Sequence, residues 1–440
     1  MKNSLAILLW LAFPAFVQQQ PPPPPVAFPP FEVDQVKVDM AIEKGVKYLK
    51  SQNAGFLQPM EHIGRKMGPR ELVLWTYVHA GVPENDPAFV QLFDNMIKDK
   101  LEATYCVSVQ AMILEEVNRV KYQQRIWQCA KFLVDNQSAQ GFWGYGDPTV
   151  YAEDVPTTAP ERKDVSTSAK NARSFDVLPP PGVKVKPPVK HRLKVKRDRE
   201  GNPNDNSNTQ YATLGLRACY DAGIELPEEV ISKLVAWYRK TQKKPEGPAI
   251  KLDMKDAQDR IQKGASGVME SFSAEPAGWC YGDHDHKAYG SMSAGSLGGL
   301  VISRYLQDND WDSKLGSARP VKRSWKKDKD VLEGMAWMAK NFSVTCNPGP
   351  YEHANFEENS KHFHYYYLYA LERAGLLYGT EWMGSHKWYP IGAKYLIEQQ
   401  GANGSWNGDA LDTCFAILFL KRATRPLDVA THSAGSARNR

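Results

Sequence analysis

The sequence predicts an all-α protein in which six helical hairpins form an inner ring of helices inside an outer ring. Three observations carry this prediction: a repeated loop phrase, apolar residues at helical spacing in paired segments, and a difference in composition between the members of each pair. A chain of 440 residues that is 42% hydrophobic and 24% charged can bury the continuous core that stacked hairpins share.

The loop phrase has the pattern Gln-x-x-x-Gly-x-Trp. It occurs from Gln137 to Trp143 and from Gln400 to Trp406, each time where a segment of helical periodicity ends. A Gln amide meets unpaired backbone groups at a helix end, a Gly permits a tight turn, and a Trp supplies a large packing surface. The phrase therefore joins two helices, and its tryptophans are expected to be structural. Looser copies start at Gln52 and at Gln242, where an insertion separates the Gln from Gly278-Trp279.

Apolar residues recur at helical spacing in segments that form pairs along the chain. The pairs are 39–52 with 70–81, 87–99 with 104–117, 123–137 with 208–222, 227–242 with 290–305, 328–342 with 361–374, and 386–400 with 410–423. Pro227 followed by two glutamates suits the first turn of a helix. Gly81, Gly223 and Gly375 are expected to close the segments that they follow.

The two members of each pair differ in composition. The second members are rich in small residues, as in 291–299 (SMSAGSLGG) and 410–416 (ALDTCFA), which lets helix backbones approach closely. The first members carry charged, solvated faces, such as the lysines at 44, 47 and 50. An inner ring of second members therefore lies inside an outer ring of first members. Six hairpins suffice to close such a ring, although an open solenoid satisfies the same periodicity.

The N-terminal residues predict export. Lys2 and the apolar run after it indicate a signal peptide or an uncleaved anchor over 1–17, followed by a Gln/Pro-rich linker over 18–35. The protein is then periplasmic or secreted, and no later stretch is apolar for long enough to span a membrane. The domain itself is expected over 36–425, with a flexible tail over 426–440.

Two insertions interrupt the hairpins. The first, 147–207, has clustered prolines and a basic run from Lys184 to Arg199, which indicates a solvated loop or else a clamp for an anionic polymer or lipid headgroup. The second, 243–277, is expected to fold over one mouth of the ring. A net charge of only +5 argues against a nucleic-acid partner. Six cysteines without a Cys-x-x-Cys pair indicate mostly free, buried thiols.

The loop phrases, the last two hairpins and the alternation resemble the prenyltransferase and squalene cyclase repeat superfamily, whose fold is an α/α toroid. The resemblance covers roughly Val36 to Ala423 and is nearest to exported single-toroid proteins of planctomycetes, which have similar phrases at 289–292 (YGSM), 366–373 (YYLYALER) and 413–420 (TCFAILFL). Most members of that group have no assigned reaction. The resemblance implies a central cavity for an apolar or isoprenoid-like ligand and leaves open whether the chain is a prenyltransferase- or terpene-cyclase-like enzyme.

Cyclases of this superfamily start carbocation chemistry from an Asp-x-Asp-Asp phrase before an inner helix, where a protonated carboxyl reaches an alkene. Asp283-His-Asp285-His286 stands near the corresponding place and makes Asp283 and Asp285 candidate catalytic acids. His286 replaces the last Asp of the phrase, which puts proton-initiated cyclization in doubt. A charged turn or a metal site are the alternatives.

Protein prenyltransferases of the superfamily hold zinc, which makes a thiolate, with an Asp-x-Cys pair and a distant His. Asp412-Thr-Cys414 has this spacing, and His362 and His364 precede it, which is not the family's order. The resemblance therefore implies these four residues as candidate zinc ligands and Asp412 also as a catalytic residue. A helix start with acidic residues at Asp409 and Asp412, and a small core residue at Cys414, is the structural alternative.

Aromatic residues are dense around the fifth inner segment. In the cyclase relatives such rings line the cavity, stabilise a cation and accept isoprenoid chains, which makes Tyr281, Tyr365, Tyr366 and Tyr369 candidate cavity residues. Packing alone also uses such rings. A noncatalytic envelope scaffold and a carbohydrate-active α/α-barrel enzyme with paired carboxylates therefore stay open as alternative functions.

Overall fold

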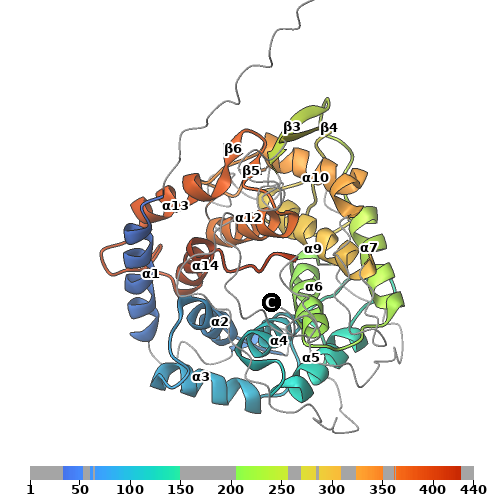
Figure 1. Cartoon of the computed structure of the whole chain (residues 1–440). Coiled ribbons are helices and arrows are strands. Elements are labelled where there is room, and N and C mark those ends of the chain that lie inside the picture. The colour runs from blue at the N-terminus through green and yellow to red at the C-terminus, as the bar shows by residue number, and fades with distance from the viewer. Residues whose placement is uncertain are drawn as a thin grey trace, which may run out of the picture. The chain divides into compact units, whose positions relative to one another are not determined.

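The helices alternate along the chain between an outer and an inner ring (Figure 1). A computed structural model describes residues 33–52, 60–62, 65–148, 205–255, 269–283, 287–308, 324–349, 361 and 363–427. The outer helices are α1 (Gln35–Lys50), α3 (Pro87–Lys98), α5 (Gln123–Asp135), α7 (Glu228–Thr241), α10 (Lys329–Lys340) and α13 (Trp388–Gln399). The inner helices are α2 (Arg70–Ala80), α4 (Thr104–Asn118), α6 (Asn206–Asp221), α9 (Gly290–Asp308), α12 (His364–Tyr378) and α14 (Ala410–Lys421).

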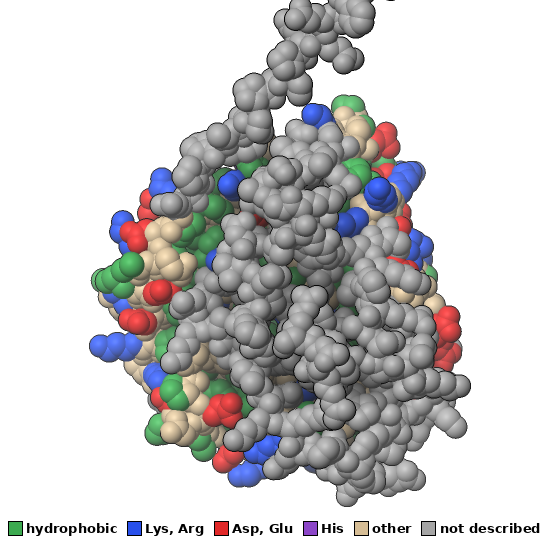
Figure 2. Space-filling model, in the orientation of Figure 1, with side chains coloured by type: hydrophobic (Ala, Val, Ile, Leu, Met, Phe, Trp, Pro, Cys, Tyr) green, Lys and Arg blue, Asp and Glu red, His purple; other side chains and the backbone are tan. Residues whose placement is uncertain are grey.

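The inner ring is closed. Each inner helix packs against the next one in the order α2, α4, α6, α9, α12 and α14, and α14 packs against α2. The six expected hairpins and the α/α toroid are therefore confirmed, and the open solenoid is excluded. Figure 2 shows side chains of both charges scattered over the outer part of the face in view. Among the described helices, none combines the length and apolar character that crossing a bilayer requires.

Small residues of the inner helices permit the close packing that the composition predicts. A Cβ atom on Gly295 of α9 would lie 2.0 Å from Gln210 Oε1 of α6, and one on Gly299 would lie 2.2 Å from the Tyr238 hydroxyl of α7. Helix α6 is buried at every residue except Ser207. All six cysteines are free, as expected.

Two of the three expected closing glycines end their helices. Gly81 and Gly223 have φ values of 78° and 86°, which favour glycine. The expectation for Gly375 is wrong, because α12 continues to Tyr378 and ends at Gly379, whose φ is 83°. Gly375 instead gives room to Trp388 of α13, since a Cβ atom there would lie 2.5 Å from the indole nitrogen.

The loop phrase links neighbouring outer helices. Gln137 Nε2 donates to the carbonyl of Gly141, at 3.2 Å, and to that of Val230 in α7, at 2.9 Å. Gln400 Nε2 makes the same two bonds, to Gly404 and to Ala41 of α1, both at 2.8 Å. The second of these bonds joins the end of the last outer helix to the first outer helix. It therefore closes the outer ring.

The interrupted copy at Gln242 has the same geometry. Its Nε2 donates to the carbonyls of Ala277, at 3.0 Å, and Asp330 of α10, at 2.8 Å. The three indole nitrogens of Trp143, Trp279 and Trp406 each donate at 2.8 Å to a carbonyl near the end of the preceding outer helix, and the three side chains are fully buried. The expected structural role of these tryptophans is confirmed.

Three short antiparallel β-hairpins lie outside the helices in the described ranges. They are β1 (Met60–His62) with β2 (Arg65–Met67), β3 (Ile250–Lys255) with β4 (Met269–Ala274), and β5 (Trp382–Met383) with β6 (His386–Lys387), and one 3-10 turn, η1 (Ser324–Lys327), precedes α10. The β3–β4 hairpin belongs to the second insertion and packs against the outer helix α10 (Figure 1). That this insertion folds over one mouth of the ring stays a prediction. Most of the first insertion, 149–204, lies outside the described residues.

Candidate functional site

The inner helices run parallel, so the ring has an N-terminal end and a C-terminal end with different chemistry. At the N-terminal end, the hydroxyl groups of Ser207 in α6 and Tyr366 in α12 lie 2.9 Å apart. At the C-terminal end, the chain that follows α14 turns into the ring (Figure 1). We call residues 423–427 the C-terminal segment.

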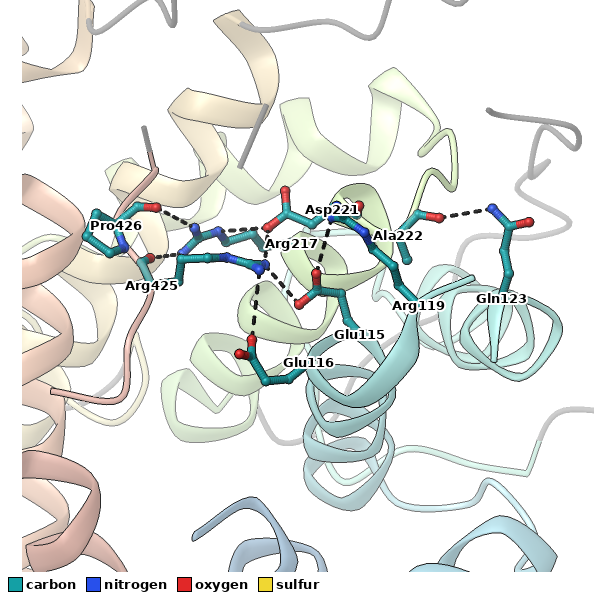
Figure 3. Close-up of polar contacts among 9 residues, drawn as sticks. All are labelled: Glu115, Glu116, Arg119, Gln123, Arg217, Asp221, Ala222, Arg425 and Pro426. Carbon is teal, nitrogen blue, oxygen red and sulfur yellow. Dashed lines mark hydrogen bonds and ion pairs between the residues drawn. The ribbon is translucent and has the colours of Figure 1, made fainter. Parts of the chain in front are cut away.

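Arg425 of the C-terminal segment binds three acidic residues of the inner helices (Figure 3). Its Nη2 atom lies 2.8 Å from Glu115 Oε2 of α4 and 2.9 Å from Asp221 Oδ2 of α6, and its Nη1 atom lies 3.8 Å from Glu116 Oε2. The Arg425 side chain is only 10% exposed. A cation from the end of the chain therefore neutralises carboxylates that lie inside the ring.

The backbone of the C-terminal segment is held as well. Arg217 of α6 donates to the carbonyls of Arg425, at 2.7 Å, and Pro426, at 3.0 Å (Figure 3). Glu372 of α12 accepts from the backbone nitrogen and the hydroxyl of Thr424, at 2.9 and 2.7 Å. The segment therefore ties α4, α6 and α12 together and closes this end of the ring. A cavity of about 50 Å³ that remains beside it has room for a few water molecules.

Aromatic rings dominate the N-terminal half of the inner ring. Tyr366 of α12 lies 6.3 Å from Tyr211 of α6 and 5.4 Å from Phe415 of α14, measured between ring centroids. Tyr105 of α4 lies 4.1 Å from Tyr211, and Tyr369 lies 6.1 Å from Phe415. Four inner helices thus contribute rings to one cluster, which we call the aromatic cluster.

Some side chains at this end keep accessible surface. Tyr105, Ser207 and Tyr366 are half-buried, although the outer helices enclose the inner helices on which they lie. Burial nevertheless raises the pKa of the Tyr105 and Tyr366 hydroxyls well above the usual value. All three residues lie in the first turn of their helices, so their accessible surface faces the N-terminal end of the ring.

The four predicted cavity tyrosines do not lie together. Tyr366 and Tyr369 belong to the aromatic cluster, and the Tyr369 hydroxyl accepts from Trp75 Nε1 of α2 at 3.1 Å. Tyr365 contacts His364, whose ring lies 5.4 Å from Tyr395 of the outer helix α13. Tyr281 is 36% exposed and donates to Asp205 at 2.7 Å.

Asp205 is a fully buried carboxyl at this end that the sequence analysis did not single out. One oxygen accepts from the backbone nitrogens of Ser207 and Asn208, at 2.7 and 3.0 Å, and the other from the Asn208 amide and the Tyr281 hydroxyl, at 2.6 and 2.7 Å. Burial raises its pKa, while the hydrogen bonds from Asn208 and Tyr281 lower it. Asp205 therefore caps α6, and both its oxygens are engaged. The sequence signal that could have identified Asp205 is an Asp directly before a helical segment, which is typical of a helix N-cap.

Of the predicted acids, Asp283 is half-buried and lies 4.0 Å from Lys240 Nζ. Asp285 lies outside the described residues, as do His284 and His286. Asp412 lies in the first turn of α14, where its backbone nitrogen donates to Asp409 Oδ1 at 2.9 Å and its carboxyl accepts from the Asn407 amide at 2.9 Å. Asp409 and Asp412 thus have the positions of capping residues.

The three predicted zinc ligands that the structure describes, His364, Asp412 and Cys414, do not form a metal site with one another. Cys414 is fully buried, and burial raises the pKa of its thiol to about 12, which disfavours the thiolate that zinc requires. His364 Nε2 lies 2.8 Å from the Val344 carbonyl, and burial lowers its pKa to about 4. Within the described ranges, no group of three or more His, Cys, Asp or Glu side chains is placed to hold a metal ion. His362 lies outside those ranges.

A cavity of about 290 Å³ lies between the start of α2 and the start of α4. Its buried charges are Arg70 and Glu71, which pair with each other, and Arg70 also pairs with Asp99 at 2.7 Å. Burial raises the pKa of the Cys106 thiol in its lining well above the usual value. The buried charges here pair with one another, and the thiol is protonated, so this cavity has no evident reactive group.

No family model matches the chain, and no curated protein matches it. Among solved structures, the chain is similar to a variant of the type II terpene cyclase MstE from Scytonema in complex with its product, merosterolic acid A. The two share 11% sequence identity and a TM-score of 0.46, over 88% of this chain and 97% of that chain. A likeness at this level assigns no activity to the present chain.

Proposed function

We propose that this protein binds an apolar, isoprenoid-like molecule inside its inner ring, among the residues of the aromatic cluster. The observation that supports the proposal is the accessible surface of Tyr105, Ser207 and Tyr366 within the enclosed ring. Flat aromatic faces accept apolar chains at little entropic cost. Because the C-terminal segment closes one end, the ligand enters from the N-terminal end.

The proposal is one of binding, and it includes no reaction. Asp205, a described acid close to Tyr366, uses both oxygens as a cap, and the Cys414 thiol is buried with a raised pKa. Export is a further part of the proposal, supported by the apolar run that follows Lys2. Mass spectrometry of the intact protein recovered from cells measures whether the first residues have been removed.

Fluorescence titration of the full chain with the methyl ester of cis-parinaric acid, an uncharged polyene, tests the binding. Saturable binding is expected, and Phe415→Ala and Tyr366→Ala should each weaken it roughly tenfold, because each removes an aromatic contact surface. Phe93→Ala is the matched control, since Phe93 is a half-buried ring on the outer helix α3 that stacks on Phe89. An ester that does not bind, or that binds all variants equally, contradicts the proposal and favours the noncatalytic scaffold.

A further inference from the structure

Arg373 of α12 is a buried cation that has no carboxylate within ion-pair distance among the described residues. Its side chain is 2% exposed, and its guanidinium carbon lies 4.3 Å from the centroid of the Tyr369 ring and 5.4 Å from that of Tyr211. The Nη2 atom donates to Gln210 Oε1 at 2.7 Å, whereas the Nη1 atom is buried and has no hydrogen-bond partner. An arginine stays protonated, so this charge cannot be removed by titration.

The other buried arginines of the described ranges all have a carboxylate partner. Arg70 pairs with Glu71 and Asp99, Arg119 pairs with Glu115, and Arg217 pairs with Asp221. No carboxylate oxygen of the described part lies within 4.0 Å of the Arg373 guanidinium nitrogens, and two aromatic faces offset only part of the penalty of burying a charge. Arg373 is thus the buried arginine of the described ranges whose charge an anionic ligand could neutralise.

The guanidinium is held in place before any ligand arrives. Gln210 accepts from Arg373 and donates through Nε2 to the Tyr366 hydroxyl at 2.7 Å. Gln210 also packs directly against Gly295 of α9, so closely that a Cβ atom on Gly295 would lie 2.0 Å from its Oε1 atom. Arg373 is therefore connected, through the Gln210 amide, to Tyr366, which keeps accessible surface at the N-terminal end of the ring.

We propose that Arg373 binds the carboxylate head group of an amphipathic ligand whose apolar body lies in the aromatic cluster. The inference rests on the proposed function and adds the charge of the ligand to it. The one positive charge of the Arg373 guanidinium matches a monoanion, and a more highly charged head group would exceed it. The planar guanidinium also suits the planar carboxylate. The ligand class is therefore a long-chain or terpenoid carboxylic acid.

Gln210→Glu gives the sharpest test, because it places a carboxylate of the same shape on the Arg373 guanidinium. It should raise the melting temperature of the ligand-free protein. In titrations at neutral pH, the wild-type protein should bind cis-parinaric acid more tightly than its methyl ester, by roughly tenfold to a hundredfold. Gln210→Glu should abolish this preference and leave the affinity for the ester nearly unchanged.

Arg373→Met, which removes the charge and keeps a long side chain, should likewise abolish the preference, and Arg373→Lys should retain part of it. Equal affinities of the wild-type protein for acid and ester, or a preference that survives in Gln210→Glu, overturn the carboxylate site and leave the proposed function standing. If neither probe binds, the proposed function fails, and this inference fails with it.

Discussion

The two ends of the inner ring use their buried polar groups in opposite ways. At the C-terminal end, Arg425 and Arg217 meet Glu115 and Asp221 in a cluster that pairs charge with charge. In the aromatic cluster, the buried cation Arg373 meets rings and one amide. We infer that the C-terminal end is structural, because the chain itself supplies both partners of each ion pair there.

The same difference appears in the space that each end leaves. Beside the C-terminal segment lies a small cavity of about 50 Å³. The N-terminal end instead leaves Tyr105, Ser207 and Tyr366 half-buried inside the ring. We therefore expect changes at the C-terminal end to act mainly on stability, and changes in the aromatic cluster to act mainly on binding.

The largest effect is expected for Arg425→Met. Removal of this cation leaves Glu115, Glu116 and Asp221 buried with a deficit of positive charge, and breaking a buried pair in this way costs about 3–5 kcal/mol. Urea unfolding at neutral pH, followed by circular dichroism, measures the loss. Binding of the parinaric ester, measured where the variant is folded, should stay unchanged.

Arg239→Met is the matched control for this prediction. Arg239 also pairs with two carboxylates, Asp328 and Asp330, but its side chain is 45% exposed, so its loss should cost at most about 1 kcal/mol. Equal losses for the two variants would show that the C-terminal segment does not lock the ring. Weaker ester binding by folded Arg425→Met would show that the two ends are coupled.

Local signals made most of the ring predictable from sequence. The Gln-x-x-x-Gly-x-Trp phrase contains its own turn and one of the two acceptors of its Gln, and the other acceptor is a carbonyl of the next outer helix. Even the copy at Gln242, interrupted by an insertion, makes both kinds of bond. Gly375 misled because an isolated glycine suits a helix end as well as a close contact, and only the position of Trp388 decides between them.

The site was less predictable because its residues are distant in sequence. Arg425 meets Glu115 across 310 positions and Asp221 across 204, and Arg373 meets Gln210 across 163. No local pattern marks such a pair. Asp412 and Cys414 have the opposite character: their spacing is a strong local pattern, yet Asp412 lies in the first turn of α14 and Cys414 in the core.

An intermediate effect is expected for Gly404→Ala, which tests how much the loop between α13 and α14 contributes to closure of the outer ring. The φ of Gly404 is 89°, and a Cβ atom would lie 2.5 Å from the Lys44 carbonyl of α1, so α1 must shift away from the loop that closes the outer ring. We expect a loss of about 2–3 kcal/mol in urea unfolding.

Gly408→Ala separates the two causes of that loss. Its φ is 69°, but nothing lies within 4 Å of the added carbon, so only the backbone strain of about 1 kcal/mol remains. A Gly404→Ala variant as stable as Gly408→Ala would show that the contact with α1 contributes nothing to closure. The C-terminal segment would then be the main contribution to closure of the ring.

The smallest effect is a difference between two hydroxyl groups, one at each end. Thr424→Val removes a hydroxyl that donates at 2.7 Å to Glu372, a fully buried carboxylate, and should cost about 2 kcal/mol. Tyr366→Phe removes a hydroxyl bonded to the neutral groups of Ser207 and Gln210 and should cost about 1 kcal/mol. Tyr366 is half-buried, so water can replace part of what is lost. Equal costs in parallel urea titrations would mean that water reaches neither hydroxyl site. The proposed difference in solvent access between the two ends would then be wrong.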